Sequence, residues 1–111
     1  LKPRKGCLRM AGETAAAYRQ CFLSDTRRAQ DLFVSLGIEA PVCYTYPYGA
    51  VNAEAQALTA VCGFSVTLSC EEGVTALTRD TACLKGIRRN NRDGRWSSAQ
   101  FWDALLAQTE G

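Results

Sequence analysis

The sequence predicts an α/β fold: a small, mostly parallel sheet with helices, in the order α-β-α-β-β-α. Stretches with an apolar residue at every third or fourth position alternate along the chain with short apolar runs rich in β-branched and aromatic residues. Glycine or proline stands at most junctions between them. Strands that alternate with helices usually pair in parallel, with the helices on the sheet. At 111 residues, the chain fits a single domain over residues 1–111.

A long first helix is expected from about Thr14 to Leu36, after an irregular lead-in over residues 1–12. Its apolar residues recur at three- and four-residue steps and form one stripe on the helix surface. This stripe comprises Tyr18, Cys21, Phe22, Ala29, Leu32, Phe33 and Leu36. Gly37 then supplies a residue that can adopt a left-handed conformation, and Ile38 stands where a capping hydrophobic contact is expected. The helix should therefore end at this glycine.

Three strands and two further helices complete the predicted order. The strands are expected over residues 42–46, 64–69 and 84–89. Asn52 can cap the second helix, because its side chain can accept a hydrogen bond from the first helical turn. The inner face of that helix should consist of Leu58, Val61 and Cys62. The last helix should begin at Ser97-Ser98-Ala99-Gln100, which has the spacing of a capping box.

A sheet of so few strands leaves its edges exposed unless something covers them. The predicted fold therefore suggests either a fragment of a larger α/β barrel or a homodimer formed through a sheet edge. The chain begins at Leu1, without methionine and without an apolar signal segment. It is accordingly expected to be a piece of a longer protein.

Composition argues against several classes of function. The net charge is only +2, and it gives no reason to expect nucleic acid as a partner. No apolar run approaches the roughly 20 residues of a membrane-spanning helix. The chain contains no histidine, which is the commonest general base and the commonest metal ligand. Its six cysteines are widely spaced, with no C-x-x-C pair, so neither a zinc knuckle nor a thioredoxin-like site is expected.

The candidate functional residues lie in the turn Tyr46-Pro47-Tyr48-Gly49. This turn falls at the carboxyl end of the first predicted strand, where parallel α/β folds bind their ligands. Pro47 fixes one backbone angle, and Gly49 permits a sharp turn. Tyr46 and Tyr48 should point in roughly opposite directions, so that one packs inward while the other faces a pocket. Backbone N–H groups left free in such a turn can bind an acyl oxygen. The alternative is a rigid turn whose tyrosines only pack.

The longer stretch YTYPYGAVNAEAQALTAVCGFSVTLSCEEG resembles the third signature region of the polysaccharide deacetylases, carbohydrate esterase family 4, also known for NodB homology. That region has an aromatic-x-Tyr-Pro-Tyr-Gly turn, an Asn before a helix, a Gly-aromatic pair and a strand that ends in an acidic, glycine-containing loop. The matching residues are Tyr44, Tyr46, Pro47, Tyr48, Gly49, Asn52, Gly63, Phe64 and Glu71-Glu72-Gly73. The resemblance spans about residues 12–106.

The resemblance implies that the chain forms the carboxyl-terminal part of a distorted, incomplete β/α barrel. It also implies a hydrolase, often bacterial, that removes N-acetyl groups from a polysaccharide or oligosaccharide with a divalent metal, usually zinc. Tyr48 would line the acetyl pocket, and its backbone N–H would help to hold the oxyanion. The other substrate-binding residues would be Tyr46, Pro47, Gly49 and Arg89.

The metal ligands of such enzymes, one Asp and two His, are not represented in the sequence. The chain has no histidine and no opening Asp-Asp signature, and Thr45 stands where many members have an arginine. The metal ligands are therefore expected before Leu1, in a longer parent protein. The chain alone is expected to bind no catalytic zinc and to be inactive.

A second interpretation is a non-catalytic carbohydrate-binding or structural α/β module, such as an inactive relative of these enzymes. Its sugar-stacking platform would consist of Tyr44, Tyr46, Tyr48 and Trp96. The two interpretations differ in what the parent protein must contain, since only the enzyme needs two Asp and two His in its upstream part.

Overall fold

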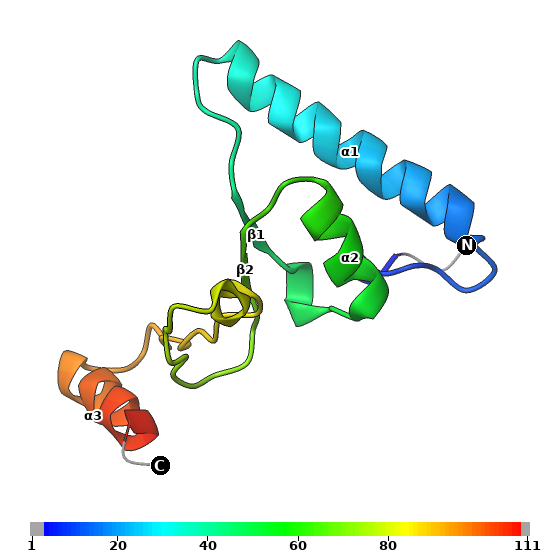
Figure 1. Cartoon of the computed structure of the whole chain (residues 1–111). Helices are drawn as coiled ribbons and strands as arrows, with labels where there is room; N and C mark the ends of the chain where they lie inside the picture. The colour runs from blue at the N-terminus through cyan, green and yellow to red at the C-terminus, as the bar shows by residue number, and fades with distance from the viewer. Residues whose placement is uncertain (1–3, 110–111) are drawn as a thin grey trace.

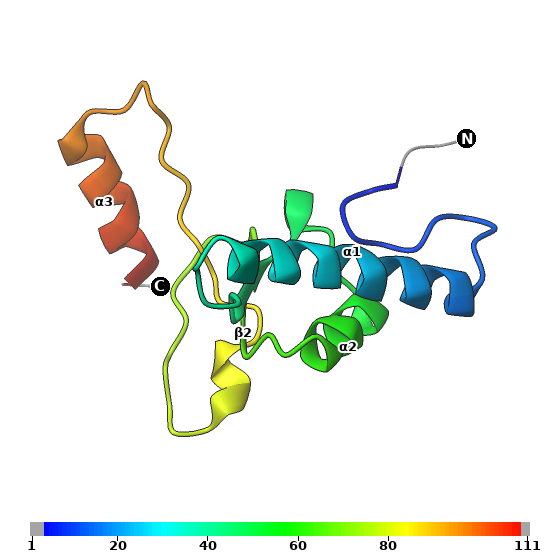
Figure 2. The ribbon, with the colours of Figure 1, turned by 90° about the horizontal axis from the view of Figure 1, so that it is seen from above.

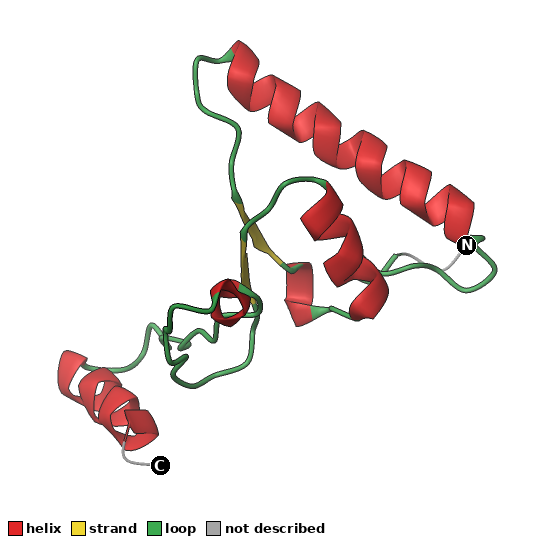
Figure 3. Ribbon diagram, viewed as in Figure 1, coloured by secondary structure: helices red, strands yellow, loops and turns green. Residues whose placement is uncertain are grey.

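The computed structural model describes residues 4–109 and has a mixed fold of helices around a small parallel sheet (Figures 1 and 3). Its α-helices are α1 (Ala15–Ser35), α2 (Ala53–Val61) and α3 (Ser98–Thr109), its strands are β1 (Cys43–Thr45) and β2 (Val66–Leu68), and its 3₁₀ turns are η1 (Pro47–Gly49) and η2 (Thr81–Leu84). The predicted α/β class and the parallel pairing of the first two strands are confirmed.

The sheet consists of β1 and β2 in parallel, with Tyr44 opposite Thr67. The predicted third strand is reduced to an isolated parallel bridge between Ile87 and Leu68. The expectation of a full strand over residues 84–89 was wrong because Gly86 has a φ of 74°, which breaks the extended backbone just before the bridge. The order across the sheet is nevertheless β1, β2 and then Ile87, so three successive chain segments run side by side in one direction.

Gly37 ends α1 as expected, and Gly63 ends α2 by the same hydrogen-bond pattern. After α1, the N–H of Gly37 donates to Val34 and the N–H of Ile38 donates to Phe33. After α2, the N–H groups of Gly63 and Phe64 repeat these two bonds with the carbonyl groups of Ala60 and Thr59. Each pair is a Schellman motif built on a left-handed glycine, at φ 79° and 89° respectively.

The core forms where α1 and α2 pack together beside the sheet. Buried side chains from the lead-in, both helices and the turn after β1 make up one cluster: Cys7, Tyr18, Phe22, Tyr46, Ala55 and Leu58. A chain of aromatic contacts joins this cluster to β1, since Tyr44 lies 6.1 Å from Phe22 and 5.4 Å from Tyr46, measured between ring centroids. The core therefore includes Tyr46, the first residue of the turn Tyr46-Pro47-Tyr48-Gly49 that was singled out from the sequence.

The predicted apolar stripe of α1 is buried over its first half alone. Tyr18 and Phe22 are in the core, whereas Leu32, Phe33 and Leu36 are 60%, 41% and 67% exposed. On α2, Val61 is also exposed, and Ala55 and Thr59 take buried positions beside Leu58. The second half of α1 extends past α2, so no described element covers it (Figure 1).

The last helix, α3, lies at the opposite end of the molecule from α1 (Figure 2). Its predicted capping box is formed: the N–H of Gln100 donates to Ser97 Oγ, and the N–H of Ser97 donates to Gln100 Oε1. Within residues 4–109, none of the helices combines the length and the apolar character that a membrane crossing requires.

Candidate functional site

Three chain segments reach the same end of the sheet, and each brings polar groups to it. The η1 turn follows β1, Cys70 follows β2, and Arg89 follows the bridge at Ile87. Because all three segments run in the same direction, these residues share the carboxyl edge of the sheet. We call Tyr48, Gly49, Cys70 and Arg89 the carboxyl-edge site.

The two tyrosines of the turn face opposite environments, as predicted, but the pleat of the strand is not the cause. Residues two apart in a strand share a face, and here β1 ends at Thr45 and the left-handed backbone of Tyr48 turns its ring away. Tyr46 is 1% exposed, and its hydroxyl group lies 3.2 Å from the Oγ1 atom of buried Thr59. Tyr48 is 86% exposed. Tyr46 therefore anchors the turn in the core with its ring enclosed, and its contact with substrate stays a prediction. The ring of Tyr48 is open to solvent.

Tyr48 has an unusual backbone conformation, with φ 58° and ψ 15°. It is the one non-glycine residue with a positive φ among residues 4–109. A left-handed conformation costs a residue with a side chain about 1–2 kcal/mol. Pro47 and Gly49 lie on either side of it, and the turn is closed by bonds from the N–H of Gly49 to Tyr46 and from the N–H of Ala50 to Pro47. These two hydrogen bonds hold the strained residue in place.

The same turn leaves one backbone donor free. The N–H of Tyr48 donates to no acceptor within the described part of the chain. The N–H groups of the next two residues are both used inside the turn. An unpaired N–H beside an exposed aromatic ring can donate a hydrogen bond to a ligand carbonyl or oxyanion.

Cys70 connects the turn to Arg89. A Cβ atom added to Gly49 would lie 2.8 Å from the Cβ atom of Cys70, so the two segments are in close contact. The guanidinium group of Arg89 donates to Cys70 Sγ at 2.9 Å and to the carbonyl oxygen of Ser69 at 2.7 Å. Arg89 was singled out from the sequence, and it does lie at this edge. Cys70 was missed, although its position directly after the second strand is a usable signal.

The lead-in segment packs against the turn. Residues 4–12 form no helix or strand, as expected, but they are held rather than frayed. A Cβ atom on Gly6 would lie 2.6 Å from the carbonyl oxygen of Pro47, and the thiol of Cys7 donates to the carbonyl oxygen of Ala50 at 3.6 Å. Tyr18 in turn donates to the carbonyl oxygen of Cys7. Residues 1–3 of the predicted lead-in lie outside the residues that the structure describes.

A small cavity of about 160 Å³ lies behind the turn, between the lead-in, α1 and β1. Its lining includes Cys7, Tyr18, Tyr44 and Pro47. Burial raises the pKa of the Cys7 thiol, raises the pKa of Tyr18 to about 12, and raises the pKa of Tyr44 further. These groups are therefore neutral near pH 7, and they are suited to packing and hydrogen bonding rather than to proton transfer.

The four-residue aromatic platform is not formed. Tyr46 is buried, and Tyr44 packs between Phe22, Tyr46 and Phe64. Of the tyrosines in the turn, Tyr48 alone has an open ring. Trp96 is half-buried near the start of α3, well after the sheet in the chain.

The described residues do not fit the metal site that the resemblance implies. They contain no group of three or more His, Cys, Asp or Glu side chains arranged to hold an ion. The six cysteines are free thiols and do not gather at one place. Any catalytic metal of a parent protein would need ligands that this chain does not supply.

Comparison with known proteins assigns no family: no protein-family model matches the chain, and no curated protein matches it. What the site can do is therefore inferred from its own groups. An exposed ring, an unpaired N–H and a fixed guanidinium group together suit a polar ligand with a carbonyl or acidic oxygen.

Proposed function

We propose that this chain is the carboxyl-terminal part of a metal-dependent carbohydrate N-deacetylase, whose complete domain is a distorted, incomplete β/α barrel. The observation that carries the proposal is the backbone of Tyr48. A strained residue with an unpaired N–H, held at the carboxyl edge of a parallel sheet, is typical of a binding or catalytic turn. A turn that served packing alone would have no need of a strained tyrosine that points its ring into solvent.

In this proposal the N–H of Tyr48 donates a hydrogen bond to the acetyl oxygen of the substrate. Negative charge grows on that oxygen when the amide carbon is attacked, so the bond strengthens in the transition state. Loss of one such donor lowers kcat by about 10²–10³. The ring of Tyr48 packs against the acetyl group or the sugar, and Gly49 leaves room for the segment at Cys70.

The proposal assigns no catalytic step to the metal, because this chain does not present its ligands. Zinc or another divalent ion, with the residues that hold it, would belong to the part of the parent that precedes residue 1. A parent sequence with no pair of histidines and no aspartate pair upstream would contradict the enzyme proposal.

A second candidate function rests on the same exposed ring. Tyr48 is 86% exposed, and a sugar ring can stack on such a surface without any chemistry. In that case the chain would be a carbohydrate-binding module or an inactive relative of the enzyme. Both functions predict sugar binding, but only the first predicts acetate release.

The experiment measures acetate release from an N-acetylglucosamine oligomer by the full-length parent, with and without zinc or cobalt. Metal-dependent release that a chelator abolishes is the expected result. If no acetate is released from several acetylated glycans, with metal present and the protein folded, the enzyme proposal is rejected and the carbohydrate-binding module is favoured.

A backbone ester at position 48 then tests the proposed donor. Replacing Tyr48 by the corresponding α-hydroxy acid removes its N–H and keeps its ring, and we expect kcat to fall about 10²–10³-fold. The control Tyr48→Phe keeps the N–H and should fall far less. Equal activity of the ester and the unmodified protein would exclude the N–H as the oxyanion donor.

A further inference from the structure

A second hollow adjoins the carboxyl-edge site. It has a volume of about 310 Å³, and its lining consists of Cys70, Glu72, Arg89, Asn90, Asn91 and Arg92. Cys70 and Arg89 belong to both regions, and Cys70 contacts both Gly49 of the turn and Arg89. We call this hollow the arginine pocket.

The two arginines of the pocket are fixed by different contacts. Arg89 donates to Ser69 and Cys70, which uses two of its five N–H groups. The guanidinium carbon of Arg92 lies 4.9 Å from the centre of the Phe101 ring, on the first turns of α3. Both guanidinium groups therefore keep donors for a ligand while their planes are held by protein contacts.

The charge of the pocket favours an anion. Glu72 is the single acidic residue of the lining, against two arginines. The carboxylate of Glu72 accepts a hydrogen bond from the backbone N–H of Asn91 at 3.3 Å. Its backbone carbonyl oxygen accepts a hydrogen bond from the guanidinium group of Arg88. No ion pair joins Glu72 to Arg89 or Arg92 in the described structure. The positive charge of the pocket is thus not cancelled from within.

We infer that the arginine pocket binds an oxyanion, a carboxylate, sulfate or phosphate group carried by the carbohydrate ligand. The planar guanidinium fork suits two oxygens of such a group. The Asn91 side chain adds a neutral donor, whereas the Asn90 amide nitrogen already donates to the carbonyl oxygen of Gly73 at 3.2 Å. The carbohydrate part of this inference rests on the proposed function. The substrate would then be an acidic sugar or its oligomer, with its acyl group at Tyr48 and its charge beyond Cys70.

Nuclear magnetic resonance titration of the isotopically labelled 111-residue chain tests the inference. The probes are glucuronic acid, glucose 6-sulfate, glucose 6-phosphate and neutral glucose. We expect at least one acidic sugar to shift the amide signals of residues 70–72 and 89–92, to bind at least tenfold more tightly than glucose, and to weaken as salt is added. Which acid binds best identifies the group. Equal binding of glucose, shifts confined to other regions, or no binding of any acid would each overturn the inference.

Two variants and a control assign the binding to the pocket. Arg92→Gln should weaken binding of the acid roughly tenfold or more, since it removes one charged donor set. Arg89→Gln should do the same, and its amide spectrum would show whether the sheet edge has kept its structure. The control Arg28→Gln removes the same charge from the exposed surface of α1 and should leave the affinity unchanged. An affinity that is the same in Arg92→Gln and in the unchanged chain would contradict the assignment.

The outcomes for the pocket and for the enzyme proposal can be told apart. Acid binding by the chain, together with no acetate release by the parent, would retain the pocket and reject the deacetylase. Acetate release from neutral and acidic glycans at equal rates, with no acid binding here, would retain the deacetylase and reject the pocket.

Discussion

The hydroxyl group of Tyr18, in the first turns of α1, donates a 2.6 Å hydrogen bond to the carbonyl oxygen of Cys7 in the lead-in. Both residues are buried, and burial raises the pKa of Tyr18 to about 12, so the phenol stays protonated and can donate. Cys7 in turn donates its thiol to the carbonyl oxygen of Ala50, just after the candidate turn. Tyr18 therefore ties α1, the lead-in and the turn together.

Substitution of Tyr18 by Phe should lower the free energy of unfolding by about 1–3 kcal/mol. The ring still fills its place in the core, but the carbonyl oxygen of Cys7 loses its partner in a buried environment. Chemical denaturation of the two proteins measures the difference. The control Tyr48→Phe removes an exposed hydroxyl group and should change stability by less than about 0.5 kcal/mol. Equal stability of Tyr18→Phe and the unchanged protein would show that the lead-in is not held by this bond.

Substitution of Gly49 by Ala should destabilise the protein more than the same change at Gly12. Both glycines have a positive φ, 67° and 84°, so each alanine has the same conformational penalty of about 1–2 kcal/mol. At Gly12 the new Cβ atom meets nothing within 4 Å, whereas at Gly49 it would lie 2.8 Å from Cys70 Cβ. Overpacking of this kind adds about 1–3 kcal/mol. Denaturation midpoints of the two variants give the difference, and equal losses would mean that the turn and Cys70 are not in contact.

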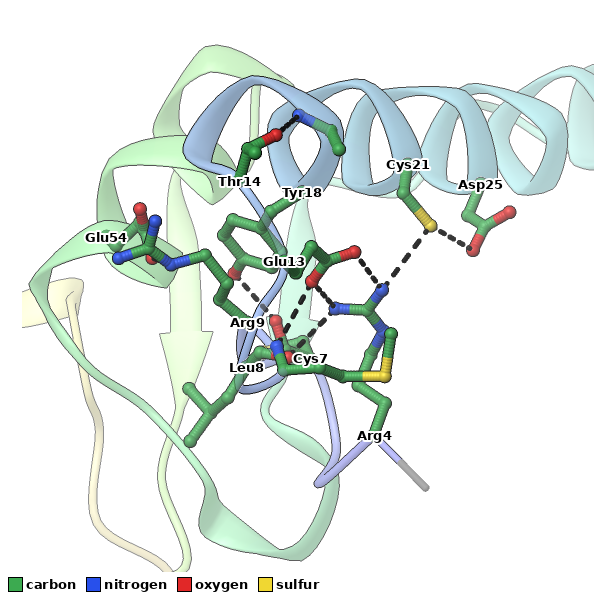
Figure 4. A network of polar contacts seen from close by, with 12 residues as sticks. Arg4, Cys7, Leu8, Arg9, Glu13, Thr14, Tyr18, Cys21, Asp25 and Glu54 are labelled. Atoms are coloured by element: carbon green, nitrogen blue, oxygen red, sulfur yellow. Dashed lines mark hydrogen bonds and ion pairs between the residues drawn. The ribbon is translucent and has the colours of Figure 1, made fainter. Parts of the chain in front are cut away.

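The Arg4–Glu13 pair predicts a loss of stability in acid. Arg4 donates to both carboxylate oxygens of Glu13, at 2.9 and 2.8 Å, and chiefly for this reason the pKa of Glu13 lies below its ordinary value of 4.5 (Figure 4). A carboxylate with a lowered pKa stabilises the fold above its unfolded pKa, and this contribution disappears as the pH falls through the folded value. Glu13→Gln should therefore flatten the fall in stability below about pH 4.5, measured by denaturation at a series of pH values.

The control for the acid series is Glu39→Gln. Glu39 is exposed and makes no ion pair with any residue in the range 4–109. Its substitution should leave the pH dependence as it was. The same curve for Glu13→Gln and the unchanged protein would show that the pair with Arg4 does not contribute in solution.

Features that depend on a few neighbouring residues could be predicted from the sequence. The glycine ends of α1 and α2, the Asn52 cap and the capping box at Ser97 are each decided within one helical turn, and all of them are formed. The opposite environments of Tyr46 and Tyr48 have a different cause: residues two apart in a strand would share a face, and the left-handed backbone of Tyr48 separates the two rings.

Features that depend on residues far apart in the chain could not be predicted from local sequence patterns. Contact between Cys70 and Arg89 requires the register of two segments on the sheet, which no local pattern encodes. The exposed half of the α1 stripe, from Leu32 to Leu36, has the pattern of a buried face, but its partner is not among the described residues. Similarly, Gly86 interrupts the third strand although the surrounding residues favour one.

β1 pairs with β2 along one side only, and from its unpaired outer edge we predict that the chain self-associates. Val42 and Tyr46 use their backbone groups to bond β2, so the backbone groups of Cys43 and Thr45 face the other edge. We propose that this edge pairs with a second copy of the chain. Thr45→Lys should shift a dimer seen by sedimentation to monomer, because a charged side chain opposes edge pairing. The control Ala60→Lys, on the exposed side of α2, should not. A monomer at every concentration would reject the homodimer, and the edge would then be free for strands of the parent barrel.

Substitution of Tyr48 by Gly should stabilise the protein while it weakens the proposed site. The left-handed backbone of Tyr48 costs about 1–2 kcal/mol, and glycine adopts it freely, although glycine also increases the entropy of the unfolded chain by about 0.4–1 kcal/mol. The net gain in the free energy of unfolding should be roughly 0.5–1 kcal/mol. Tyr48→Ala removes the same exposed ring but keeps the penalty, so it should show no gain. If the two variants unfold at the same denaturant concentration, the turn stores no strain, and the observation on which the proposed function rests is lost.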